Sequence, residues 1–229
     1  MKIHFGTDDF DRFFLRAEAS GHWDGRPTID KFLLDHQPMD ESRERIAVAS
    51  SLLFGSYFGG LVNFSSQINL VTANAIQEFV PNRHIHIDRI EERPKAIPAH
   101  HGRMWVTDNL QRFSTLLTTR EKGDRILGVV SSTEFTGSSA APGALIVPCN
   151  AQVFGPQGGD DYFKSVLAAA VLLASDFEAG VLSLQLDNAH AAEPTPAVKR
   201  KITSLLGAVS LGVTWEDVNL DREKELQSS

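Results

Sequence analysis

One cysteine and several polar residues near it in the predicted fold have the types that nucleophilic catalysis uses. Cys149 directly follows the apolar run ALIVP at 144–148. A thiolate can attack an electrophilic carbon when an imidazole takes its proton and a carboxylate orients that imidazole. We interpret His190 as the base and Asp187 or Glu134 as the orienting carboxylate. The candidate substrate-binding residues are Ser132, Asn150 and Asn188.

The residues around Cys149 also fit a second interpretation. The local sequence PCNAQ lacks the glycines that usually let a nucleophile stand on a strained turn between a strand and a helix. A lone cysteine at the end of a strand is often a small buried apolar side chain. Ser132 is the alternative nucleophile if the thiol is packed in this way.

A second group of residues has the types and spacing of metal ligands. In the segment HIHID, His84, His86 and Asp88 alternate, so they share one face if the segment is a strand. Imidazole and carboxylate groups suit a divalent transition metal such as zinc, iron or manganese. Arg83 and Arg89 raise the cost of holding a cation there. The competing interpretation is a solvated strand face without a metal.

The second half of the chain predicts the elements that would position the catalytic candidates. An apolar strand at 144–147 is followed by a helix from 160 to about 177 and a strand at 181–186. Thr195 and Pro196 then open a helix to about 206, and a last strand follows Gly212. This βαβαβ pattern over residues 144–218 predicts an α/β fold: a mixed, mainly parallel sheet flanked by helices.

Parallel strands place their carboxyl ends at one edge of a sheet, where ligands bind in open α/β folds. A strand at 125–131 precedes Ser132, Thr133 and Glu134, and the strand at 144–147 precedes Cys149, Asn150 and Gln152. The strand at 181–186 precedes Asp187, Asn188 and His190, and a strand at 61–64 precedes Ser65, Ser66 and Gln67. We expect these groups to gather at one crevice.

The first half is less regular and contains most of the histidines and phenylalanines. Its expected elements are a strand at 2–5, helices at 8–19, 41–57 and 69–79, a short helical turn at 29–34, and strands at 61–64, 84–90 and 103–107. The contrast favours two parts, residues 1–115 and residues 116–229; a single domain is the alternative.

Composition limits the partners and the location. The chain has 22 Lys and Arg against 29 Asp and Glu, a formal net charge of −7, so we expect neither nucleic acid nor an anionic membrane as a partner. The longest apolar run, 166–174, is far shorter than the roughly 20 residues of a membrane span. The start MKIHFGTDDF lacks the apolar stretch of a signal peptide, and one cysteine suits a reducing compartment, so we expect a cytoplasmic protein.

Three functions follow from these observations. The first is a small-molecule hydrolase or transferase whose site lies at the carboxyl ends of the strands. The second is a non-catalytic module that binds a partner or assembles with itself, because the small residues of helix 41–57 would allow close packing against a second subunit. The third is a metal-binding protein that uses His84, His86 and Asp88 to hold a divalent transition metal; whether the chain uses a cofactor is otherwise unknown from the sequence.

Overall fold

A mixed sheet of nine strands forms the centre of the molecule. The computed structural model describes residues 1–91, 97–155, 160–186 and 194–215. The strand order is β1-β2-β3-β11-β9-β8-β12-β13, and β10 pairs with β11 beside this path. The strands are β1 (Lys2–Thr7), β2 (Phe13–Glu18), β3 (Lys31–Leu34), β8 (Gly102–Thr107), β9 (Arg125–Ser131), β10 (Ser139–Ala141), β11 (Ala144–Cys149), β12 (Ala179–Leu184) and β13 (Gly212–Trp215).

Strands β11, β9, β8, β12 and β13 are parallel, whereas β1, β2, β3 and β10 pair with their neighbours in the antiparallel sense. The chain runs outward from β8 to β9 and β11, then returns to the other side of β8 for β12 and β13. The direction of winding therefore reverses between β8 and β12. In open sheets of this kind, the carboxyl edge near the reversal is where ligands bind.

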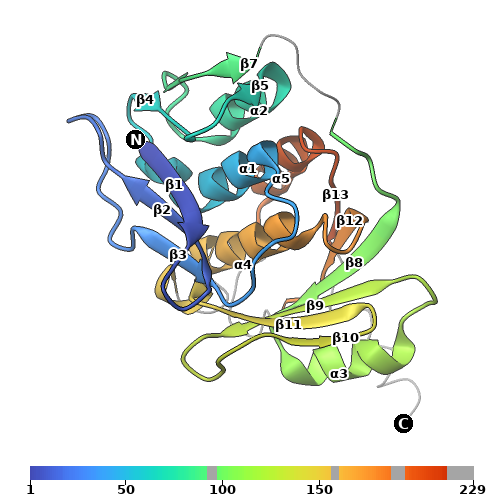
Figure 1. The fold of residues 1–229 in the computed structure, drawn as a ribbon. Helices are drawn as coiled ribbons and strands as arrows, with labels where there is room; N and C mark the ends of the chain where they lie inside the picture. Colours follow the sequence, from blue (N-terminus) through green and yellow to red (C-terminus); the bar gives the residue numbers. More distant parts are fainter. Residues whose placement is uncertain (92–96, 156–159, 187–193, 216–229) are drawn as a thin grey trace.

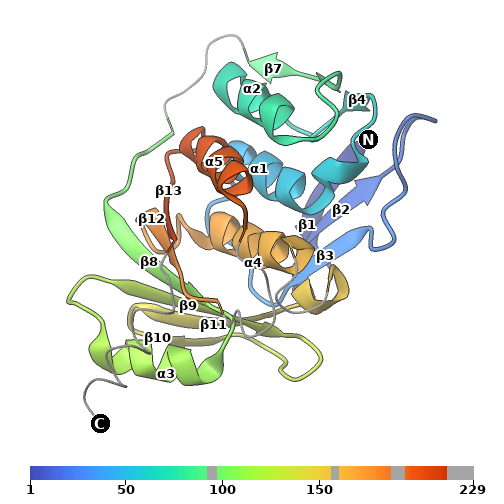
Figure 2. The same ribbon diagram turned by 180° about the vertical axis from the view of Figure 1, so that it is seen from behind.

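Helices cover both faces of the sheet. Figures 1 and 2 show α3 on one face and α1, α4 and α5 on the other, with α2 outside α1 and α5. The helices are α1 (Arg43–Phe54), α2 (Leu70–Phe79), α3 (Leu110–Thr119), α4 (Asp160–Leu173) and α5 (Pro196–Gly207), with short 3-10 turns η1 (Gly55–Tyr57) and η2 (Ala151–Val153). Within the described residues, no helix has the length and apolar character needed to cross a membrane.

The alternation of side chains along β9 separates two apolar cores. Ile126 lies in a small core with Phe113 and Leu116 of α3, whereas Leu127 and Val129 point into the large core beneath α1 and α4. Gly128 lets the ring of Phe113 rest on the sheet, because a Cβ at this position would stand 2.9 Å from that ring. The strands of this region are apolar on both faces, as buried parallel strands require.

The amino terminus is buried beside the antiparallel part of the sheet. The ammonium group of Met1 donates to Asp24 Oδ2 at 2.6 Å, to Ser20 Oγ at 2.8 Å and to the carbonyl oxygen of Leu61 at 2.6 Å. Asp24 also accepts from the backbone N–H groups of Ser20, Gly21 and Gly59. We call these residues the Met1–Asp24 cluster; it joins β1 to the loop that precedes β3.

The predicted fold class is confirmed, since the sheet is mixed, contains a parallel portion and is flanked by helices. The βαβαβ pattern corresponds to β11, α4, β12, α5 and β13, of which the structure describes the last strand as far as Trp215. Helix α4 ends at Leu173 instead of near 177, and Gly180 lies in β12. A Cβ at Gly180 would stand 1.8 Å from the carbonyl oxygen of His100, so the glycine permits a close backbone approach. The boundary between residues 115 and 116 falls inside α3, and one sheet contains strands from both sides of it.

Two helical predictions in the first half are wrong. Residues 8–19 form a tight turn and β2, in which Phe13, Leu15 and Ala17 are buried while Arg16 and Glu18 are exposed. This alternation with a period of two is the pattern of a half-buried strand. Residues 31–34 form β3, because Phe32 and Leu34 enter the large core in the same way.

The strand predicted over 84–90 is interrupted. Its residues contribute to two small parallel sheets, in which β6 (His86–Ile87) pairs with β4 (Leu61–Val62) and β7 (Ile90–Glu91) pairs with β5 (Ile68–Asn69). The interruption lies at Arg89, whose φ is 61°, in the left-handed region that strands do not use. Of the segment HIHID, only His86 and Ile87 are in a strand, because His84 lies in the turn before β6 and Asp88 follows its end, so the segment has no continuous strand face.

Helix α1 confirms the predicted helix near 41–57, but its small residues have partners within this chain. Ala47, Ala49, Ser50 and Ser51 are all buried, and α1 packs against α4 and α2. These residues are not available to contact a second subunit. The small residues that favoured self-assembly are thus explained by packing within the core of this chain.

Candidate functional site

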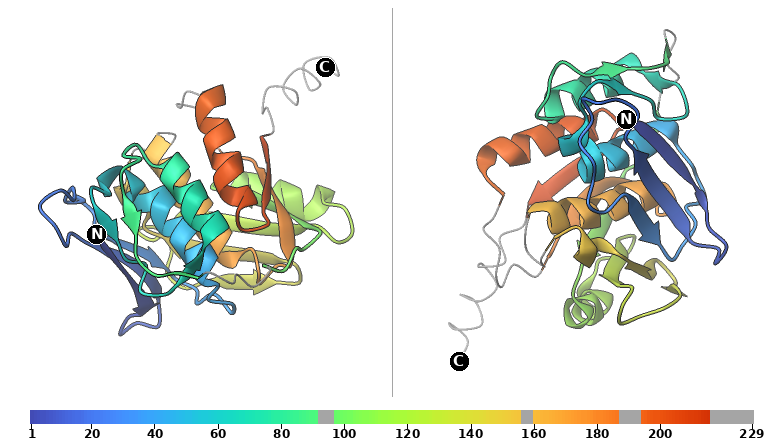
Figure 3. Two further views of the ribbon diagram at one scale, coloured as in Figure 1. Left: turned by 90° about the horizontal axis from the view of Figure 1, so that it is seen from above. Right: turned by 90° about the vertical axis from the view of Figure 1, so that its left-hand side faces the viewer.

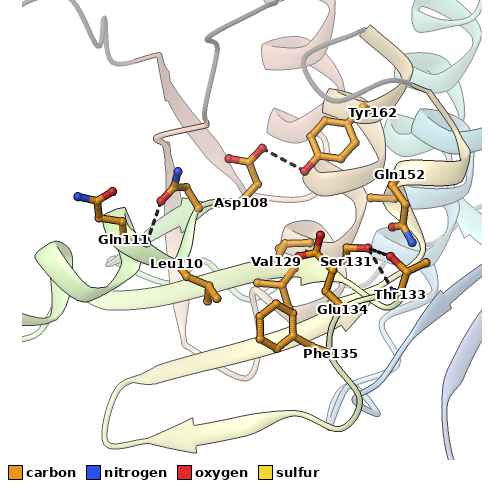
Figure 4. Close-up of a pocket in the computed structure, with 13 residues that line it drawn as sticks. Asp108, Leu110, Gln111, Val129, Ser131, Thr133, Glu134, Phe135, Gln152 and Tyr162 are labelled. Carbon is orange, nitrogen blue, oxygen red and sulfur yellow. Dashed lines mark hydrogen bonds between the residues drawn. The ribbon is translucent and has the colours of Figure 1, made fainter.

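A cavity of about 450 Å³ opens at the carboxyl edge of β8, β9 and β11. Asp108 and Asn109 follow β8, Ser131, Thr133 and Glu134 lie at and after the end of β9, Gln152 lies in η2 after β11, and Tyr162 lies in the first turn of α4. Figure 4 shows Leu110 and Gln111 on one side of the cavity and Gln152 and Tyr162 on the other. The ends of three parallel strands and the starts of two helices thus contribute side chains to one space.

Local hydrogen bonds explain why these side chains are held there. Asn109 caps α3, since its Oδ1 accepts from the backbone N–H groups of Gln111 and Arg112 at 2.8 and 3.1 Å. The Tyr162 hydroxyl donates to Asp108 Oδ2 at 3.0 Å and so connects α4 to the end of β8. At the end of β9, the hydroxyl groups of Ser131 and Thr133 are hydrogen-bonded at 2.7 Å.

Gln152 differs from the other polar residues of the cavity wall. Both its amide nitrogen and its amide oxygen are buried, and neither has a hydrogen-bond partner among the residues that the structure describes. A buried polar group without a partner costs about 1–3 kcal/mol of stability. Most buried polar groups in folded proteins are bonded, so this amide calls for an explanation outside the stability of the fold.

The charges of the wall are of one sign. Asp108 and Glu134 are its ionisable acids, and among the described residues that line the cavity there is no lysine, arginine or histidine. Phe135, Leu110 and Val129 add apolar surface. Carboxylates in a hollow repel anions and attract cations or hydrogen-bond donors. The wall therefore suits a neutral or positively charged polar molecule better than a phosphate.

Cys149 lies at the end of β11, but its side chain belongs to the large core. The residue is 1% exposed, and it is not part of the cavity wall. Burial raises the pKa of the Cys149 thiol to about 12, so the thiolate that nucleophilic attack needs is strongly disfavoured at neutral pH. The structure places Cys149 as the packed apolar side chain of the second interpretation, which argues against its role as a nucleophile.

The other members of the predicted site have different outcomes. Glu134 lines the cavity. Asn150 instead holds β3 against β11, because its Oδ1 accepts from Leu33 N at 2.7 Å and its Nδ2 donates to the Lys31 carbonyl at 2.9 Å. Ser132 donates its backbone N–H to the Cys149 carbonyl and does not line the cavity. The remaining predicted residues, Asp187, Asn188 and His190, lie outside the described residues.

The expected convergence of strand ends is therefore partial. Thr133, Glu134 and Gln152 share one cavity, as the strand-end rule predicts. The segment after 61–64 does not join them, because β4 pairs with β6 in a separate small sheet. There the Ser65 hydroxyl donates to the carbonyl oxygen of Ile3.

The residues of the proposed metal site are not gathered around a common point. His84 and His86 are exposed, and the Asp88 carboxylate accepts from Asn63 Nδ2 at 2.8 Å. Among the described residues, no three His, Cys, Asp or Glu side chains lie together in a way that could hold a metal ion. Only His86 and Ile87 of this segment are in a strand, so the common strand face on which the metal prediction depended is absent from residues 84–88.

The sequence reasoning missed five polar residues of the cavity wall: Asp108, Asn109, Gln111, Ser131 and Tyr162. Asp108 and Asn109 directly follow the predicted strand at 103–107, so applying the strand-end rule to that strand as well would have found them. Tyr162 had no such signal, since it reaches the cavity from the first turn of α4. Comparison of the chain with protein-family models, with curated proteins and with solved structures finds no match in any of the three.

Proposed function

We propose that the chain binds a small polar molecule of neutral or positive charge in the cavity at the carboxyl edge and acts on it as a hydrolase or transferase. The observation that carries the proposal is the convergence of Asp108, Glu134 and Gln152 from three different strand ends on one hollow. Such a hollow beside a reversal of winding is a common place for ligands in open α/β sheets. The reversal of winding supports the location of the ligand site, and the wall residues support hydrolysis or group transfer there.

Each wall residue has a role that its surroundings suit. Glu134 is the catalytic candidate that lines the cavity, and its carboxylate would take a proton from water in a hydrolase or from an acceptor hydroxyl in a transferase. Asp108, held by Tyr162, would accept hydrogen bonds from donors of the bound molecule. The amide of Gln152, which has no hydrogen-bond partner within the described ranges, would gain partners if the ligand offers it a donor and an acceptor.

Binding can be tested with isotope-labelled full-length chain and a panel of defined probes: glucose, adenosine, spermidine and inorganic phosphate. We expect saturable shifts of the backbone amides of Ser131, Glu134 and Gln152 with at least one neutral or cationic probe, and none with phosphate. If neither neutral nor cationic probes shift these amides, or if phosphate shifts them equally, the assignment of the cavity is wrong.

Turnover is tested separately with neutral p-nitrophenyl acetate and p-nitrophenyl glucoside. A positioned general base contributes roughly 10²- to 10⁴-fold to a rate, so Glu134→Gln should lower any hydrolysis by about 100-fold. The matched control is Glu121→Gln, because Glu121 is an exposed carboxylate in the turn after α3. Binding without turnover in both the wild type and the variant would favour the non-catalytic binding module over the enzyme.

A further inference from the structure

A groove between α2 and α5 differs in charge from the cavity at the carboxyl edge. Its volume is about 340 Å³, and its wall combines Glu78 and Phe79 of α2, Arg83 from the segment after α2, and Arg200 and Lys201 of α5. The two helices lie side by side on the outer side of the molecule (Figure 3). Three cationic side chains and one carboxylate therefore surround this groove in a chain whose net charge is −7.

The two arginines of the groove have no partners in the part of the chain that the structure describes. Neither Arg83 nor Arg200 forms a hydrogen bond or an ion pair with any residue in the described part of the chain. Other arginines on the surface do find carboxylates: Arg12 donates to Asp8 at 2.8 Å and Arg16 to Asp30 at 3.0 Å. Exposed guanidinium groups in the described part of the chain thus pair at some sites and lack partners at others, since Arg26 and Arg43 are also exposed and have none there.

The third cation of the groove already has a structural role. Lys201 Nζ donates to the carbonyl oxygen of Phe79 at 3.4 Å, at the carboxyl end of α2, where a positive charge is favourable. Arg83 and Arg200 are thus the cationic side chains of the groove that remain for binding an anion. Ser204 of α5 adds to the same wall a hydroxyl group that has no partner among the described residues.

We propose that this groove is a binding site for a small phosphate-like oxyanion. Guanidinium groups present paired N–H donors in a plane that matches the oxygens of a phosphate. Two such groups, one from each side of the groove, can hold one oxyanion between them, and the Ser204 hydroxyl can donate to a further oxygen. The small volume of the groove favours a compact anion over an acidic protein segment.

The experiment is a titration of the isotope-labelled full-length chain with sodium pyrophosphate, with sodium chloride adjusted to keep the ionic strength constant. We expect saturable shifts of the backbone amides of Arg83, Arg200 and Ser204. Because charge-assisted hydrogen bonds are strong, Arg83→Gln and Arg200→Gln should each weaken binding about tenfold. Both side chains are exposed, so the melting temperature of each variant should match that of the wild type.

The control variant is Lys122→Gln, which removes an exposed positive charge in the turn between α3 and β9, at the opposite end of the molecule (Figure 1). Its affinity for pyrophosphate should equal that of the wild type. Shifts that do not saturate, or equal affinities in all three variants, would mean that the groove is only a solvated basic surface. Tighter binding of hexaglutamate than of pyrophosphate would also overturn the proposal and indicate an acidic protein partner. The amide of Glu134 reports on the other cavity, so this result is independent of that proposal.

Discussion

The Met1–Asp24 cluster and the cavity wall around Gln152 both contain buried polar groups. The polar groups of the cluster are hydrogen-bonded, whereas the amide of Gln152 is not bonded to any described residue. In the cluster, the ammonium group has three partners and the carboxylate has partners on both oxygens. In the cavity wall, both amide atoms of Gln152 lack a partner in the described part of the chain. Satisfied polar groups stabilise or specify a fold, whereas an unsatisfied one lowers its stability. The comparison thus separates polar residues that serve the fold from those free to serve a ligand.

The largest effect should come from breaking the satisfied cluster. Asp24→Asn leaves the ammonium group of Met1 buried without its counter-charge, since the two side chains are 2% and 0% exposed. We expect the free energy of unfolding to fall by about 3 kcal/mol, as when one partner of a buried ion pair is removed. Asp30→Asn is the matched control, because its ion pair with Arg16 is exposed and should contribute less than about 1 kcal/mol. If urea denaturation gives the two variants equal losses of unfolding free energy, the buried ion pair contributes no more than the exposed one, which contradicts this prediction.

The cluster also predicts how stability depends on pH. Burial alone would raise the pKa of Asp24, but hydrogen bonds from the Met1 ammonium group and from backbone N–H groups outweigh it and lower that pKa from 3.8 to about 2. A carboxyl group with a lowered pKa stabilises the folded state above the unfolded pKa and loses that contribution as pH falls through the folded pKa. The free energy of unfolding should therefore decrease between about pH 4 and pH 2.

A pH titration of Asp24→Asn measures the part that belongs to the cluster. Asp8 has its pKa lowered to about 2 by its hydrogen bonds with Arg12 and acts over the same range, so wild type and variant must be compared directly. We expect a shallower decrease for Asp24→Asn in thermal unfolding between pH 4 and pH 2. Identical slopes would show that the cluster does not hold its carboxylate in the charged form.

Cys149 lies at the same edge of the sheet as the cavity, but its side chain is packed in the core. It therefore measures what a polar group costs in the core beside the cavity. Cys149→Ser places a hydroxyl group in an apolar environment and should lower the free energy of unfolding by about 2 kcal/mol. Cys149→Ala adds no polar group and should cost less. Iodoacetamide should label the wild type only after denaturation, given the pKa of about 12. Rapid labelling of the folded protein would restore the thiol as a candidate nucleophile.

The smallest effect, and the one with the opposite sign, is expected at Gln152. Gln152→Met keeps the length of the side chain and removes an unpaired amide, so the free energy of unfolding should increase by about 1 kcal/mol. The same replacement at Gln77 removes a donor to the carbonyl oxygen of Ile85 at 3.0 Å and should cost about 1 kcal/mol. Opposite signs in denaturation support the distinction between satisfied and unsatisfied groups. A loss at both positions would show that the Gln152 amide serves the fold.

Elements with strong local signals were predictable. The predicted strand 125–131 matches β9, and the predicted Thr195 cap is present, with its hydroxyl accepting from Val198 N at the start of α5. Elements with ambiguous or weak signals were not. Residues 13–18 alternate as a strand does, yet the closely spaced apolar residues FF and L also fit one side of a helix. Helix α3 escaped the sequence reasoning because its serine and threonines are weak helix formers, and the predicted boundary was placed inside it.

The site was predictable only as far as the order of the strands could be inferred. The rule of strand ends led to Glu134 and Gln152, because β9 and β11 are adjacent and parallel. It failed for Cys149 because the rule locates the end of a strand and does not say to which face of the sheet a side chain points. The grouping of His84, His86 and Asp88 came from strand alternation instead, and only His86 and Ile87 of that segment are in a strand.

The small core beneath α3 has a consequence for motion. Phe113 and Leu116 of α3 meet only Ile126 and Ala144 as fully buried apolar partners there, whereas α4 is enclosed in the large core. Amide hydrogens of α3 should therefore exchange with deuterium through local opening sooner than those of α4. The first turn of α3 carries Leu110 and Gln111 of the cavity wall, so the same opening should change the shape of that part of the wall.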